Sequence, residues 1–219
     1  MKKQNTHTIS PSQIPFDAKL KVVIEFLSLN MFKSAFTTYN YYLKTAPFAT
    51  NFLTTGFLFG AGDVIAQYIL PSEHTGHTEE IYDYKRTARA VFYGSVIFSP
   101  IGSRWMYFLQ KRVHWPGKSM SNSGLNTISR VLVDQIFFSP VSLVFYFSTM
   151  SILEHGFNTD IIKRKLQNSA WSTLLTNWSV WPFVQVVNFN YIKVEHRLLV
   201  INVIAIFWNT YLSFKNSNG

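Results

Sequence analysis

The chain has 219 residues, enough for one sizeable domain, and only 14% of them are charged, against ~25% in ordinary soluble domains. Its net charge is +9, but the basic residues fall in short clusters between uncharged stretches, a pattern that disfavours a nucleic-acid-binding surface. The chain contains no cysteine, which excludes disulfides, thiolate catalysis and cysteine metal sites.

Long uncharged stretches are the main feature of the sequence. They cover residues 45–62, 135–153, 166–192 and 198–214, with 18, 19, 27 and 17 residues. About 20 apolar residues cross the hydrocarbon core of a bilayer. We therefore expect an all-α, polytopic membrane helix bundle with four or more membrane-embedded helices. The mean hydropathy is only +0.08, because polar residues are scattered through these stretches, so the helices should pack around polar groups.

The N-terminal region differs from the rest. We interpret residues 1–30 as an extension, residues 31–216 as a single membrane-helix domain and residues 217–219 as a tail. We expect no secretory signal in the extension, because Glu25 interrupts its apolar run. It also lacks the arginines of a mitochondrial presequence, since the first arginine in the chain is Arg86. Any organellar targeting is therefore expected to be internal.

The first membrane helix is expected over residues 48–70. Four small or polar residues share one of its faces, at spacings of three or four: Gly56, Gly60, Asp63 and Gln67. The G-x-x-x-G pair of Gly56 and Gly60, together with Gly62, predicts close packing of a neighbouring helix.

Asp63 is the most informative residue of this helix. An acid within a membrane helix usually faces the bundle interior or a water-filled path. Two interpretations stay open: a polar bond that packs helices together, or a role in transport. The acidic segment 71–87 contains His74 and His77, and we interpret it as a solvated loop rather than a metal site.

The second membrane helix is expected over residues 88–109. Pro100 lies near its middle and predicts a kink, because proline removes one backbone donor and clashes with the preceding turn.

The third membrane helix is expected over residues 128–153, and Pro140 predicts a kink there too. Arg130 and Asp134 are four residues apart, so they are predicted to form an ion pair along the helix. The alternative is that Asp134 and the adjacent Gln135 face the bundle interior.

The stretch 166–192 contains Pro182, which predicts a third kink. On a helical wheel its amides and one indole share a side: Asn177, Trp181, Gln185 and Asn188. The opposite side is apolar and suits lipid: Val180, Phe183, Val186 and Val187. The last stretch, 198–214, repeats this scheme with Asn202 and Asn209. Polar stripes in lipid are costly unless they meet one another or water.

Sequence motifs of nucleotide-binding loops, serine hydrolases and zinc proteases are absent from the chain. We therefore expect no enzyme activity, no metal and no cofactor.

Several blocks together resemble the Mpv17/peroxisomal-membrane-protein family, most closely its fungal stress-inducible mitochondrial members. They include "GAGDVIAQ" (60–67), "LLTNWSVWPFVQVVNF" (174–189) and "HRLLVINVIAIFWNTYLSFKN" (196–216), and they occur in the family's order. The resemblance covers residues 31–219. The family-like positions are Gly62, Asp63, Gln67, Arg89, Gly94, Pro100, Trp105, Asp134, Gln135, Pro140, Trp178, Trp181, Pro182, Gln185, Asn188, Phe189, Arg197, Trp208 and Asn209.

The resemblance implies a small multi-pass protein of an organellar membrane, here the mitochondrial inner membrane, with the peroxisomal membrane as the alternative. It also implies a non-selective or weakly selective channel that supports mitochondrial DNA maintenance and stress tolerance. Two positions depart from the family pattern. Met106 stands where tyrosine is usual, and Lys193 where a proline is usual, so charged residues must separate the last two helices.

Two functions are consistent with these observations. The first is a channel or carrier for small hydrophilic solutes, with a lumen lined by polar residues: Asp63, Gln67, Asp134, Gln185 and Asn188, with Gln135 and Asn177 as further pore candidates. The second is a structural or interaction protein whose polar stripes only hold helices and partners together. The expected partners are the lipid bilayer, small hydrophilic solutes and further copies of the chain or a larger membrane complex, without direct nucleic-acid binding.

Overall fold

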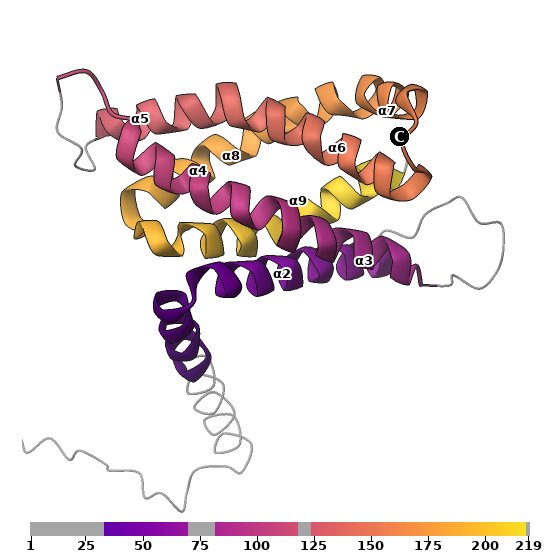
Figure 1. Cartoon of the computed structure of the whole chain (residues 1–219). Helices are drawn as coiled ribbons and strands as arrows, with labels where there is room; N and C mark the ends of the chain where they lie inside the picture. The colour runs from indigo at the N-terminus through magenta and orange to yellow at the C-terminus, as the bar shows by residue number, and fades with distance from the viewer. Residues whose placement is uncertain (1–32, 70–81, 118–123, 218–219) are drawn as a thin grey trace, which may run out of the picture. The chain divides into compact units, whose positions relative to one another are not determined.

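The computed structural model describes residues 33–69, 82–117 and 124–217 (Figure 1). Throughout these ranges the regular elements are helices, which confirms the all-α prediction for the described part of the chain. The chain divides into two compact units, Met1–Pro47 and Phe48–Gly219.

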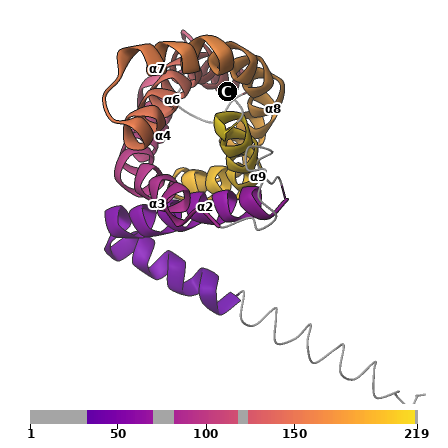
Figure 2. The same cartoon turned by 90° about the vertical axis from the view of Figure 1, so that its right-hand side faces the viewer.

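In the first unit, the described part forms a helix over residues 33–45. The described residues of the second unit form five helical rods, of which three contain a π-helical turn, and a 3₁₀ turn at Val194–His196. Their bounds are α2 Pro47–Ile69; α3 Tyr84–Phe92, η2 Tyr93–Phe98 and α4 Ser99–Arg112; α5 Gly124–Val133, η3 Asp134–Phe138 and α6 Ser139–His155; α7 Thr159–Lys165, η4 Leu166–Ala170 and α8 Trp171–Tyr191; and α9 Arg197–Ser217. Each expected membrane helix therefore corresponds to one rod, with ends that agree to within a residue where the expected range runs past the rod. Viewed end on, the rods surround a common centre (Figure 2).

Two of the π turns directly precede a Ser-Pro pair. The Ser99 N–H donates to the carbonyl of Gly94, and the Ser139 N–H donates to the carbonyl of Asp134, each five residues back. Proline has no N–H, and its ring clashes with the carbonyl four residues earlier, so a wider turn before it relieves the crowding. Pro182, in contrast, lies inside α8 without a π turn.

Local side chains set the ends of the rods. The Asp83 carboxylate accepts from the Arg86 N–H at 2.9 Å and caps α3. Asn158 caps α7 in the same way, after Gly156 ends α6 with a φ of 74°.

The separation of α8 from α9 needs no proline. The Arg197 guanidinium donates to the carbonyls of Ile192 and Phe189 at 3.1 Å each, which satisfies carbonyls that the end of α8 leaves without a helical partner. Arg197, one of the charged residues expected to separate the last two helices, therefore holds this turn.

The distribution of polar and apolar residues is inverted relative to a soluble protein. Phe57, Phe183 and Phe207 are 72%, 75% and 80% exposed, whereas Arg130 and Asn188 are fully buried. Large exposed apolar surfaces mark contact with another apolar phase. The outer surface of the second unit is therefore suited to lipid or to a partner protein.

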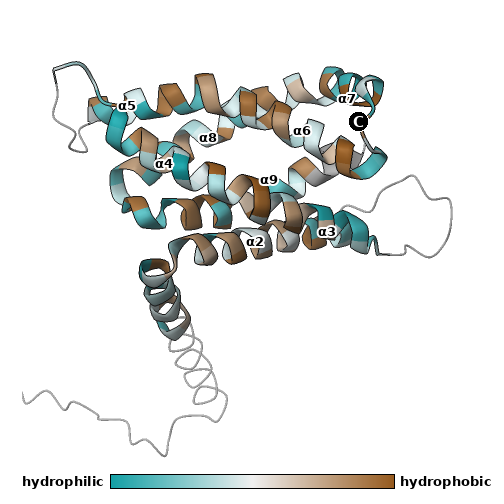
Figure 3. Cartoon of the chain, in the orientation of Figure 1, coloured by the Kyte–Doolittle hydropathy of each residue, from teal (hydrophilic) through white to brown (hydrophobic). Residues whose placement is uncertain are grey.

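One rod of the described part, Gly124–His155, is both long and apolar enough to cross a membrane on its own. The other rods have polar residues distributed along them, and α3 and α7 are mainly hydrophilic (Figure 3). Hydropathy alone therefore supports one membrane helix rather than the expected four or more.

Candidate functional site: a central cavity with a buried carboxylate

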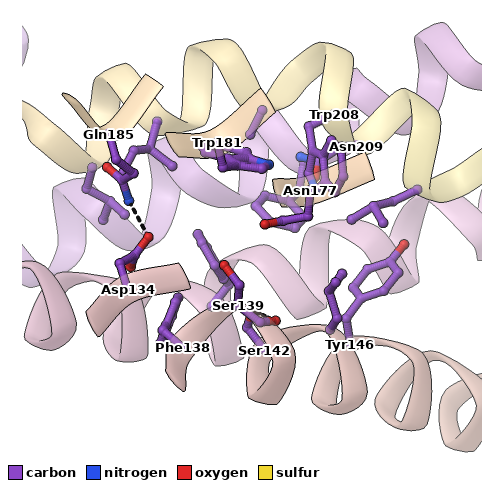
Figure 4. Close-up of a pocket in the computed structure, with 18 of the residues that line it drawn as sticks. Asp134, Phe138, Ser139, Ser142, Tyr146, Asn177, Trp181, Gln185, Trp208 and Asn209 are labelled. Carbon is purple, nitrogen blue, oxygen red and sulfur yellow. Dashed lines mark hydrogen bonds between the residues drawn. The ribbon is translucent and has the colours of Figure 1, made fainter. Parts of the chain in front are cut away.

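The candidate site is a cavity of about 90 Å³ at the centre of the second unit (Figure 4). We call it the central cavity. All five rods contribute to its lining, which consists of Phe59, Tyr93, Phe98, Gly102, Met106, Asp134, Gln135, Phe138, Ser139, Ser142, Leu143, Tyr146, Asn177, Trp181, Gln185, Leu198, Ile201, Ala205, Trp208, Asn209 and Leu212. Asp134 is the only carboxylate in this set, and the set contains no lysine, arginine or histidine.

Asp134 is only 3% exposed and is held by three neutral donors. Trp105 Nε1 donates to its Oδ1 at 2.7 Å, and Gln135 Nε2 and Gln185 Nε2 each donate to its Oδ2 at 2.9 Å. The four residues, which we call the Asp134 cluster, join three rods. A carboxylate whose partners are all neutral keeps an uncompensated negative charge when it is ionised, and here that charge faces the central cavity.

The surrounding amides and indoles fix the geometry of this cluster. Asn188 Nδ2 donates to Gln185 Oε1 at 3.2 Å, and Trp178 Nε1 donates to the Gln135 carbonyl at 3.0 Å. The Gln185 side chain therefore has its orientation set at both ends, with its amide nitrogen toward Asp134 (Figure 4).

The second buried carboxylate, Asp63, has a different environment. Arg86 Nε donates to its Oδ1 at 3.0 Å, while Thr87 Oγ1 and Gln67 Nε2 donate to its Oδ2 at 2.8 and 2.9 Å. Gln67 also binds the backbone of Asp83 through both ends of its amide. These five residues, the Asp63 cluster, tie α2 to the start of α3, and none of them lines the central cavity.

The predicted packing glycines lie where other helices approach α2 most closely. A Cβ on Gly60 would lie 2.7 Å from Val91 Cγ2, and one on Gly62 would lie 2.9 Å from Asn209 Cβ. A Cβ on Gly56 would meet Ser95 Cβ at 2.9 Å. Gly56 and Gly60 thus face the second rod, and Gly62 faces α9.

The predicted partners Arg130 and Asp134 contact other groups. Arg130 is fully buried and donates to the carbonyls of Val113 and Gln110, at 3.2 and 3.4 Å. Among the ion pairs recorded for the described residues, none joins Arg130 to Asp134.

The predicted pore residues therefore divide into two groups. Four line the central cavity: Asp134, Gln135, Asn177 and Gln185. Three do not: Asp63 and Gln67 belong to the Asp63 cluster, and Asn188 lies behind Gln185. The sequence patterns did not predict Trp105 as a donor to Asp134, or Arg86 and Thr87 as donors to Asp63. Each donor belongs to a different rod from its acceptor, and such patterns report only on residues of one helix.

Within the described ranges no group of three or more metal-ligating side chains comes together. His74 and His77 lie outside those ranges.

The sequence of the chain is similar to a known protein family and to several fungal proteins. The profile of the Mpv17 / PMP22 family matches residues 151–213. Protein SYM1 of Saccharomyces cerevisiae is 50% identical over 175 residues, covering 80% of this chain and 86% of the yeast protein. Protein SYM1 of Candida glabrata is 48% identical over 192 residues, covering 83% and 90%. Protein sym-1 of Neurospora crassa is 42% identical over 178 residues, covering 81% and 96%.

No solved structure matches the chain. The identity to these relatives exceeds 40% over most of both partners, well beyond what a shared fold alone requires. The chain therefore belongs to the Mpv17/PMP22 family of membrane proteins.

Proposed function

We propose that the protein conducts small hydrophilic solutes across the mitochondrial inner membrane through the central cavity. The observation that favours this function is the buried carboxylate of Asp134, which faces a cavity enclosed by all five rods and has only neutral partners. Acidic groups in a pore favour cations, so the same carboxylate would make the pathway weakly cation-selective.

The membrane placement rests on the inverted surface and on the family. In this proposal the five rods all lie in the bilayer, with their apolar faces toward lipid and their polar stripes toward one another. Further proposed features are assembly with other copies of the chain, a role in stress tolerance and mitochondrial DNA or metabolite homeostasis, and the absence of catalysis. They follow from the family resemblance.

The test is ion flux through the full chain reconstituted in liposomes. Replacing Asp134 with Asn keeps the side-chain shape but removes the charge, so the ratio of cation to anion permeability should fall about fivefold, the factor that ~1 kcal/mol of charge interaction gives. The matched control is Asp160→Asn, because Asp160 is an exposed carboxylate on α7 and should leave the ratio unchanged. No flux through the unmodified protein, or equal ratios for both variants, would refute the proposal.

The structural alternative retains one specific observation in its favour. The Asp63 cluster is an ion-paired junction beside close glycine contacts, and this arrangement needs no solute. Because the chain has no cysteine, single thiols distinguish the two functions. Ser139 and Ser95 are 5% and 6% exposed, but only Ser139 lines the central cavity. A conducting cavity predicts that Ser139→Cys reacts with a small charged thiol reagent and Ser95→Cys does not, whereas the structural function predicts that neither reacts.

A further inference from the structure

Three polar atoms on the wall of the central cavity are buried without a hydrogen-bond partner among the described residues. They are Asn177 Oδ1, Trp181 Nε1 and Asn209 Nδ2. Their side chains are 7%, 8% and 7% exposed, so solvent at the outer surface does not reach them. In Figure 4, Asn177 and Asn209 lie on one side of Trp181, and the Asp134–Gln185 hydrogen bond lies on the other.

Such atoms are uncommon, because buried polar groups nearly always have a partner and an indole N–H usually finds an acceptor. Other unpartnered atoms, such as Asn202 Oδ1, do not line the central cavity. Trp181 is also held in place, since its ring packs edge-on against Trp208 with centroids 5.9 Å apart. Trp181 Nε1 is therefore a fixed donor, and all three unpartnered atoms belong to residues that line the central cavity.

The chemistry of the three atoms defines what they would bind. Asn177 Oδ1 is an acceptor, Trp181 Nε1 has one N–H to donate, and Asn209 Nδ2 has two. A hydroxyl group has one O–H to donate and two lone pairs to accept, so it complements all three. An ionised carboxylate has no proton for Asn177, and an ammonium group has no lone pair for Trp181 or Asn209.

The cavity also has room for a carbon skeleton. Its volume of about 90 Å³ is several times the ~10–15 Å³ that one water needs. Rings of Tyr146 and Trp208 form apolar wall beside the three atoms. We propose that Asn177, Trp181 and Asn209 form a subsite for the hydroxyl groups of a small uncharged polyol, which deepens the proposed function by naming a solute class for the central cavity.

The test uses the full chain in lipid nanodiscs, with its six tryptophans labelled with ¹⁵N at the indole nitrogen. Trp181→Phe assigns the Trp181 signal. Glycerol should shift this signal along a saturable curve and leave the signal of Trp171, which is 63% exposed on α8, unchanged. The probe 1,2-dimethoxyethane accepts hydrogen bonds but cannot donate to Asn177, so its affinity should be about tenfold weaker.

Variants separate the subsite from general effects of substitution. Asn177→Leu should weaken glycerol binding about tenfold, because the acceptor is lost. Asn190→Leu is the matched control on the same helix; Asn190 is exposed and outside the cavity, so binding should be unchanged. If Asn177→Leu does not fold, Asn209→Ala tests the donor side by the same titration.

The outcomes distinguish binding at the subsite from conduction through the central cavity. A saturable Trp181 response in a protein that shows no flux supports the subsite and refutes conduction. Flux of glycerol with no Trp181 response, or with Asn177→Leu binding as tightly as the unmodified chain, overturns the subsite and leaves conduction intact. A linear response that is equal for glycerol and 1,2-dimethoxyethane means that the site holds water only, and this result also overturns the proposal.

Discussion

The two buried aspartates of the described structure have similar burial but opposite environments. Asp63 is 2% exposed and Asp134 is 3% exposed. The Asp63 carboxylate is paired with Arg86 at the junction of two helices, whereas the Asp134 carboxylate has neutral donors and faces the central cavity. The ion pair accounts for the buried charge of Asp63, whereas Asp134 has no such pair among the described residues, and the proposed function assigns its carboxylate to contact with a solute. Burial alone therefore does not distinguish the two environments.

The largest expected effect comes from removing the same charge at both positions. Asp63→Asn breaks the buried ion pair with Arg86 and should lower the free energy of unfolding by about 3 kcal/mol. Asp134→Asn breaks no ion pair and should cost about 1 kcal/mol, the value of one hydrogen bond. Unfolding of the two variants in mixed detergent micelles, followed by circular dichroism, measures both losses.

A second substitution checks the cause. In the Asp63→Asn background, Arg86→Met removes the second charge of the pair and should restore part of the lost stability. Equal losses for the two aspartates, or no recovery in the double variant, would contradict the distinction between a structural and a functional acid.

A smaller effect is expected from the packing beside Asp63. A Cβ on Gly62 would lie 2.9 Å from Asn209 Cβ and 3.1 Å from the Ile206 carbonyl oxygen, so Gly62→Ala should cost about 2 kcal/mol. The control is Gly124→Ala at the start of α5, where no atom lies within 4 Å and stability should not fall. Thermal unfolding compares them. If Gly62→Ala unfolds at the temperature of the unmodified protein, α2 and α9 are less tightly packed than the structure indicates.

The smallest effect is expected from Asp83, which caps α3. Substitutions there measure the contribution of the cap separately from that of the Asp63–Arg86 ion pair. Asp83→Ala removes the acceptor for the Arg86 N–H and should cost about 1 kcal/mol. Asp83→Asn keeps a capping oxygen, so its loss of stability should be smaller, roughly 0.3 kcal/mol. The same unfolding assay measures both variants, and a loss at Asp83→Ala as large as that of Asp63→Asn would mean that the cap dominates the junction.

The sequence was sufficient to predict the helical rods and the polar side of α8. Uncharged stretches bounded by charge clusters locate helices directly, and the helical wheel placed Asn177, Trp181, Gln185 and Asn188 together. All four are buried, while Phe183 on the opposite side is 75% exposed. Periodicity reports which residues share a face, so this kind of prediction needs no knowledge of neighbouring helices.

The helical wheel could not predict which residues contact one another between helices. The pair Arg130–Asp134 was predicted because the two residues are close along one helix, yet the recorded donors to Asp134 include Trp105 and Gln185 from two other rods. Asp63 accepts from Arg86, which is 23 residues away along the chain and belongs to α3 of another rod. The order of helices around the cavity determines these partners, and one sequence without an alignment contains little information about that order.

The π turn in the third rod has a consequence for the lining of the central cavity. Asp134, Phe138, Ser142 and Tyr146 all line the central cavity, and they are spaced four residues apart. An α-helix turns once in 3.6 residues, so a row with this spacing would wind slowly around a regular helix and leave the cavity. The wider turn over Asp134–Phe138 takes up part of the excess. One wider turn thus keeps this row of side chains closer to a single face of the rod, with Asp134 at one end and Tyr146 at the other.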